Sequence, residues 1–123
     1  MTVGPTKELI AQLAVEIYVS HLKRSLAFYK ALGFSIERSD DTFAVMRWES
    51  SYIFLGQINQ VAPTLDLPVA NVRVVVNHID ALWEQVQAAN MRVINTLTTQ
   101  TYGLRDFTIA DPDGFGVRFA EII

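Results

Sequence analysis

The segment "AVEIYVSHLKRSLAFYKALGFSI" at residues 14–36 has the same pattern as "NVRVVVNHIDALWEQVQAANMRV" at residues 71–93, with a constant offset of 57 positions. Each copy starts with alternating apolar residues, as in a strand with one buried face. Apolar residues at helical spacing follow, such as Leu22, Leu26 and Tyr29. Gly33 and Asn90 then end the helices, because both residue types tolerate the left-handed backbone found there.

Three more strand-like segments follow each helix. They span residues 34–39, 42–48 and 51–57 in the first half and 91–97, 104–110 and 115–122 in the second. Each half is therefore predicted to be a βαβββ module, residues 12–58 and 69–123. Residues 59–70 carry two prolines and no periodicity, which predicts a linker inside one compact body.

A chain of 123 residues is near the commonest size of a single domain. We expect one α+β domain over residues 1–123, in which paired βαβββ modules form a curved mixed sheet around a cavity. The helices are expected outside and the ligand in the cavity, because each sheet keeps one face free of its helix.

Composition excludes several classes of protein. Ten basic and thirteen acidic residues give a formal charge of −3 without a basic cluster, so no nucleic-acid partner is expected. The apolar runs are too short to span a membrane, and the first ten residues lack the apolar centre of a signal peptide, which favours the cytoplasm. Without cysteine there is no disulfide, thiolate nucleophile or zinc–sulfur site.

The stretch "DFTIADPDGFGVRFAEII" at residues 106–123 predicts a hairpin that turns at Asp111-Pro112-Asp113-Gly114. Asp40-Asp41 is predicted to form another hairpin tip. In the strand that follows the turn at residues 111–114, alternation places Arg118 on the face opposite Val117 and Phe119, and so toward the cavity.

"VSHLKRSLAFYKALGF" followed by "YGLRDFTIADPDGFGVRF" resembles the vicinal oxygen chelate superfamily. This superfamily holds glyoxalase I, extradiol dioxygenases, fosfomycin-resistance enzymes and bleomycin-resistance proteins. The resemblance covers nearly the whole chain, but its motifs are structural and do not choose among these activities.

The resemblance implies where a metal would be bound in members that use one. A His opens the first strand of each half, and a carboxylate lies four residues after the glycine of the DPDG turn; here these positions are Ala14, Asn71 and Arg118. A fourth position in strand 51–57 is Phe54. No metal and no other cofactor is therefore expected, because a guanidinium brings a fixed positive charge to the site.

Within the superfamily the chain is most similar to the bleomycin-resistance type, whose members are metal-free homodimers that sequester a drug in aromatic grooves. The resemblance thus implies a homodimer that binds a small molecule, an antibiotic or metabolite, and leans away from an enzyme. One departure is charge. An anionic or neutral ligand is favoured over a cationic one by the positive charges of Arg73 and Arg118. Arg47 would add a third positive charge if it faces the cavity.

The residues expected to bind the ligand lie on the cavity faces of the predicted strands or in the YGLRDF motif. They are Glu16, Arg47, Trp48, Phe54, Asn71, Arg73, Tyr102 and Arg118. Alternation leaves open whether Arg47 or Trp48 lines the cavity. Glu16 with the two arginines is either a ligand-binding cluster or an internal ion-pair network, and pairing is favoured because unpaired buried charges are costly.

Two other functions remain open. One is a metal-dependent lyase or dioxygenase with displaced ligands, such as Glu16 with His21 or His78. These two histidines are more simply exposed residues near the helix starts. The other is a regulatory or assembly module with a vestigial cavity. The sequence also leaves open whether the modules pair within a chain or swap between chains.

Overall fold

The computed structural model describes residues 13–59 and 68–123. The chain divides into two compact units, one within residues 1–61 and one within residues 62–123. Most of the predicted linker, residues 60–67, lies outside the described residues, as does the segment for which no signal peptide was expected.

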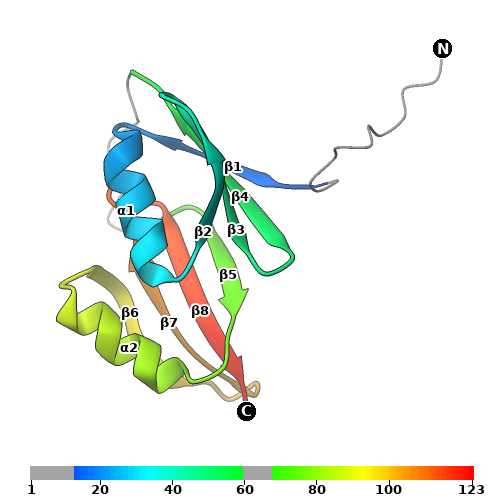
Figure 1. Ribbon diagram of the computed structural model, residues 1–123. Coiled ribbons are helices and arrows are strands. Elements are labelled where there is room, and N and C mark those ends of the chain that lie inside the picture. Colours follow the sequence, from blue (N-terminus) through cyan, green and yellow to red (C-terminus); the bar gives the residue numbers. More distant parts are fainter. Residues whose placement is uncertain (1–12, 60–67) are drawn as a thin grey trace. The chain divides into compact units, whose positions relative to one another are not determined.

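The first unit contains β1 (Val15–Val19), α1 (Leu22–Leu32), β2 (Ser35–Ser39), β3 (Phe43–Trp48) and β4 (Ser51–Gln57). Its four strands form one mixed sheet in the order β1-β4-β3-β2 (Figure 1). β1 and β4 run parallel, as the connection through α1 requires, while the hairpin-linked strands β2, β3 and β4 pair antiparallel.

Apolar residues on one face of this sheet pack with α1. Ile17, Val19 and Leu55 alternate with outward residues and are buried, as are Tyr29 and Leu32 of the helix. Apolar residues at every second position of the strands thus pack against apolar residues that repeat every 3.6 positions on the helix. Burying one such side chain contributes about 1.5–3 kcal/mol, so this face holds the unit together.

The second unit repeats this arrangement with β5 (Asn71–Val75), α2 (Ile79–Ala88), β6 (Arg92–Thr99), β7 (Leu104–Ala110) and β8 (Gly116–Ile122). Its sheet has the order β5-β8-β7-β6, with β5 and β8 parallel (Figure 1). Trp83 of α2 packs on Phe107, which in turn contacts Phe119, so the helix side of this sheet is also apolar.

The helix ends agree with the sequence prediction. Gly33 has φ +124° and Asn90 has φ +54°, both in the positive range that suits these residue types. His21 and His78 are exposed N-cap residues whose side chains make no capping hydrogen bond.

The side chains that cap both helices come instead from β4 and β8, the last strand of each unit in chain order. The backbone N–H of Leu22 donates to Gln57 Oε1 over 2.8 Å, and that of Ile79 donates to Glu121 Oε1 over 3.0 Å.

The two predicted turns form as expected. Asp111 Oδ1 accepts hydrogen bonds from the N–H groups of Asp113 and Phe115, and Gly114 has φ +93°. Asp40 Oδ1 accepts from Thr42 and Phe43 in the same way, and these hydrogen bonds hold the pKa of Asp40 below its ordinary value.

The predicted α+β fold of two βαβββ modules is confirmed, as two open four-stranded mixed sheets with one helix each. One shared domain, with a curved sheet around a common cavity, stays a prediction. Across residues 13–59 and 68–123, neither helix has the length and apolar character needed to cross a membrane.

Candidate ligand-binding site

The face of the second sheet opposite α2 carries a polar side chain on each of its four strands. The register pairs Arg73 with Arg118, Arg118 with Thr108, and Thr108 with Asn95. Residues paired in register share a face, so these four side chains form one row across the sheet. We call them the polar row.

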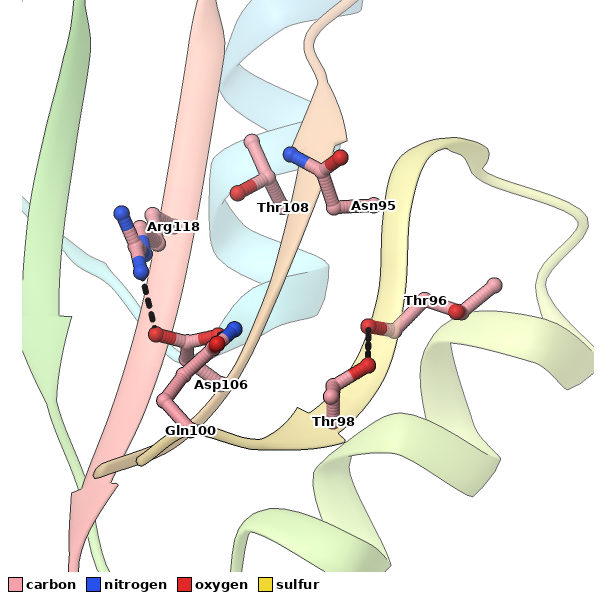
Figure 2. Close-up of a pocket in the computed structure, with 7 residues that line it drawn as sticks. All are labelled: Asn95, Thr96, Thr98, Gln100, Asp106, Thr108 and Arg118. Atoms are coloured by element: carbon pink, nitrogen blue, oxygen red, sulfur yellow. Dashed lines mark hydrogen bonds and ion pairs between the residues drawn. The ribbon is translucent and has the colours of Figure 1, made fainter. Parts of the chain in front are cut away.

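A pocket of about 310 Å³ opens on this face. It lies over β6, β7 and β8 (Figure 2), and every residue that lines it carries a hydrogen-bonding side chain. The lining residues are Asn95, Thr96, Thr98, Gln100, Asp106, Thr108 and Arg118. This volume is at the small end of the range for ligand sites.

Arg118 is held in the pocket by two partners. Its Nη2 atom donates to Asp106 Oδ2, as Figure 2 shows, and to the hydroxyl of Tyr102 over 2.9 Å. Gln100 Nε2 donates to the other carboxylate oxygen of Asp106 over 3.0 Å. Asp106 is 5% exposed and Arg118 20% exposed, so the pair is largely removed from water.

Burial raises the pKa of Asp106, but hydrogen bonds from Gln100 and Arg118 and the charges of Arg118 and Arg73 outweigh it. The net pKa of this carboxyl lies below its ordinary value of 3.8. The hydrogen bond to Asp106 raises the pKa of Arg118. The pair is therefore ionised at neutral pH, and the field of Arg73 reaches Asp106.

Other polar groups of the polar row keep hydrogen-bonding capacity. Thr108 is only 5% exposed, yet its hydroxyl has no protein partner among the described residues. Nη1 and Nε of Arg118 also make no hydrogen bond within that part of the chain. Among the described residues, the one side-chain N or O atom that is both fully buried and without a partner is Ser25 Oγ. The free atoms of Thr108 and Arg118 are therefore not fully enclosed. They are open to a ligand.

The predicted site residues of the first unit lie mainly on the face opposite α1. Glu16 and Phe54 are paired in register, and the Phe54 ring lies 5.6 Å from that of Phe43. Arg47 is on the same face, with its guanidinium 5.9 Å from the Tyr52 ring centre.

Trp48 lies on the other face of β3. Its ring is 5.0 Å from that of Phe34 and lies against Gly33, at the end of α1. The structure thus decides between the two residues that alternation left open: Arg47, rather than Trp48, shares the face of Glu16 and Phe54. A role for Trp48 in ligand binding stays a prediction.

Asn71 begins β5 on the face of Arg73 and pairs in register with Gly116. The expected contact between Glu16 and Arg118 would join the two units and also stays a prediction. What the structure adds is that Arg118 already has a carboxylate partner, Asp106, in its own sheet.

The positions that the resemblance assigns to a metal do not suit one. Ala14 has no donor atom, and Arg118 brings a guanidinium bound to Asp106. Among residues 13–59 and 68–123, no three His, Asp or Glu side chains gather closely enough to hold an ion. We therefore derive no chemistry through a metal.

Sequence reasoning missed Asp106, Gln100, Thr108 and Asn95. A signal for two of them was present: the DPDG turn fixes the hairpin register, which places Thr108 opposite Arg118, and alternation then puts Asp106 on the same face. Asn95 and Gln100 had no such signal, because the register of β6 with β7 shifts twice.

Solved structures share this fold. A bleomycin resistance determinant encoded on the transposon Tn5 has a TM-score of 0.74 and 16% identity, with 91% of this chain and 98% of that chain covered. A hypothetical protein from S. aureus has a TM-score of 0.74 and 22% identity, covering 94% and 96%. A glyoxalase/bleomycin resistance protein/dioxygenase from Nocardioides has a TM-score of 0.72 and 16% identity, covering 98% and 87%.

No curated protein matches the chain by sequence. The family model that describes the Glyoxalase/Bleomycin resistance protein/Dioxygenase superfamily matches residues 10–119, nearly the full length. With this match and the two βαβββ units, the chain belongs to the glyoxalase/bleomycin resistance protein/dioxygenase superfamily.

Proposed function

We propose that the chain is a metal-free binding protein that sequesters a small molecule, an antibiotic or a metabolite, without making or breaking a bond. The observation that carries the proposal is the pocket over β6, β7 and β8, which is lined by hydrogen-bonding side chains and where the hydroxyl of Thr108 has no partner among the described residues. That hydroxyl is not fully enclosed, so it can exchange water for a ligand that enters the pocket.

The absence of a reaction is proposed from the chemistry of the residues. The one acidic side chain lining the pocket, Asp106, is occupied by Gln100 and Arg118, and its lowered pKa makes it a weak base. The family's metal positions hold Ala14, Asn71 and Arg118. None of the residues that line the pocket offers a free carboxylate or imidazole that could act as a general base.

A homodimer and a cytoplasmic location complete the proposal. The dimer is supported by edge strands that expose apolar side chains, Val15 and Tyr18 on β1 and Val75 on β5. Light scattering at micromolar concentration should give twice the mass of the chain, and a monomer would contradict this part alone. The location rests on composition.

A thermal-shift screen of antibiotics and metabolites tests the central proposal. A compound at 100 times its dissociation constant should add about 2.7 kcal/mol of stability. The matched variant is Thr108→Val, which keeps the shape of the side chain and removes its hydroxyl. It should weaken binding by up to about tenfold, the equivalent of about 1.4 kcal/mol.

The bound compound should be recovered unchanged, and protein purified without chelator should carry far less than one metal ion per chain. Stoichiometric metal, or conversion of the compound, would support the lyase or dioxygenase alternative instead. A full screen without a hit would support a regulatory or assembly module.

A further inference from the structure

We propose that Arg73 and Arg118 form a subsite for a singly charged carboxylate group of the ligand. The two arginines are partners in the register of the parallel strands β5 and β8, on the face that carries the pocket. This inference rests on the proposed binding function and adds the chemical class of the ligand.

Like charges on directly opposite residues of neighbouring strands repel each other. Asp106 neutralises one of the two, because it is hydrogen-bonded to Arg118. Arg73 is exposed and makes no ion pair or hydrogen bond within the part of the chain that the structure describes. Two cations and one anion leave this group of three residues with one unmatched positive charge.

The free hydrogen-bond donors point to the same class of ligand. A guanidinium has five N–H donors, and Nη2 of Arg118 uses its two on Asp106 and Tyr102. Nη1 and Nε keep three N–H groups for single hydrogen bonds, and the exposed guanidinium of Arg73 keeps a two-donor edge suited to a planar, two-oxygen acceptor. The hydroxyl of Thr108, next in the polar row, is a further donor beside them.

Asp106 sets the charge that the subsite accepts. Its carboxylate is fixed against Arg118 by Gln100, so it remains close to whatever group binds the arginine. A carboxylate brings one negative charge and matches the single unmatched positive charge. A phosphate monoester brings nearly two and would be repelled by Asp106, so we expect it to bind less well.

The test uses four probes that share a phenyl group: phenylacetate, phenylacetamide, 2-phenylethylamine and phenyl phosphate. Binding to the full chain is followed by the NMR shifts of backbone amides in the pocket, at 50 mM and 500 mM NaCl. Phenylacetate should bind about tenfold more tightly than phenylacetamide, equal to about 1.4 kcal/mol, and high salt should remove most of this gain. The amine should bind worst.

Arg73→Gln should abolish the preference for phenylacetate over phenylacetamide. Because Arg73 is exposed, this variant should fold. Arg105→Gln is the matched control: Arg105 is in the strand of Asp106 but bonds Asp80 of α2 on the opposite face, so the preference should survive.

Four results would each overturn the inference. Phenylacetate and phenylacetamide could bind equally well, or the preference for phenylacetate could be unchanged in Arg73→Gln. Phenyl phosphate could bind more tightly than phenylacetate, or no probe could bind at all. If phenylacetamide binds in the pocket as well as phenylacetate, the proposed binding function stands without a carboxylate subsite. If phenylacetate binds through Arg73 but is chemically altered, the subsite stands and the proposal of sequestration fails.

Discussion

The two units of the chain have one topology but different chemistry on the face that their helices leave open. Val15 pairs with Ile53 in the first unit as Val72 pairs with Val117 in the second, so positions correspond row by row. The corresponding rows are Glu16, Phe54, Val45 and Arg38 in the first unit and Arg73, Arg118, Thr108 and Asn95 in the second.

The faces toward the helices hardly differ between the units, since both are built from buried aliphatic and aromatic residues. On the open faces, the first unit brings together the rings of Phe43 and Phe54, whereas the second has Asp106 and Arg118 at the equivalent places. The duplicated fold is thus maintained by one face of each sheet, and the other face is where the copies have become specialised.

The largest effect is expected for Asp106→Ala, which removes the carboxylate from the open face of the second unit. It leaves Arg118, 20% exposed, without its charged partner and Gln100 without its acceptor. We expect a loss of about 2–4 kcal/mol in the free energy of unfolding, measured by urea denaturation. Asp80→Ala breaks the exposed pair with Arg105 and should cost far less.

Glu16→Ala sharpens this result. If Asp106 is the partner of Arg118, the Glu16 variant should lie within about 0.5 kcal/mol of the wild type, as exposed substitutions usually do. If instead it costs as much as Asp106→Ala, then Glu16 of the first unit also pairs with an arginine, as the sequence suggested.

The pH dependence of stability separates the two units further, because Phe43 takes the place of Asp106 on the open face of the first. The pKa of Asp106 lies below 3.8 in the folded chain, so its contribution is fully present above the pKa of the unfolded chain. It is lost as the pH falls through the lower, folded value. Urea denaturation at a series of pH values should show that the wild type exceeds Asp106→Asn in unfolding free energy by a constant amount from pH 7 to about pH 5. This difference should shrink below about pH 4. A constant gap down to pH 2.5 would contradict the assignment.

Gly33 and Asn90 end equivalent helices but differ in what they tolerate. A Cβ atom at Gly33 would lie 2.9 Å from Trp48 Cζ3, with φ at +124°. Gly33→Ala should therefore cost about 2–3 kcal/mol, because the backbone is strained and Trp48 must move. Asn90 already has a side chain at φ +54°, so Asn90→Ala should cost only about 1 kcal/mol. Equal costs, measured by urea denaturation, would show that Trp48 does not restrict Gly33.

The sequence predicts the elements well because two independent periodicities and the stop residues agree. The strand 104–110 has the predicted bounds, and both helices end where Gly33 and Asn90 require. It also identifies Arg118 as a residue of the open face, since alternation is reliable beside a turn that fixes the register.

The partners of Arg118 were harder to predict. Charge and repeat symmetry pointed to Glu16, 102 positions away, whereas the carboxylate came from the neighbouring strand of the same hairpin. Alternation leaves Trp48 undecided because β3 is apolar on both faces, and its contacts with Phe34 and Gly33 assign it to the helix side. The bulges between β6 and β7 displace the register, so no periodicity could place Asn95 or Gln100 at the pocket.

The smallest effects concern the helix starts, where the two units use the same device with different charge. Gln57 Oε1 caps α1 and Glu121 Oε1 caps α2, each from the strand parallel to the one before the helix. Because His21 and His78 supply no capping hydrogen bond, Gln57→Ala and Glu121→Ala should each cost about 1 kcal/mol.

The charge-conserving comparison is finer. Glu121→Gln keeps the acceptor and loses the attraction of the carboxylate to the positive end of α2 and to Arg105, its cross-strand partner, so it should cost a few tenths of a kcal/mol. Gln57→Glu should stabilise α1 by a similar amount for the same reason. These differences can be measured by urea denaturation at low and high salt, since the charge effect should disappear in 1 M NaCl while the cost of either alanine variant remains. If both alanine variants leave stability unchanged, water hydrogen-bonds the N–H groups of Leu22 and Ile79 equally well. Gln57 and Glu121 would then position the helices without adding stability.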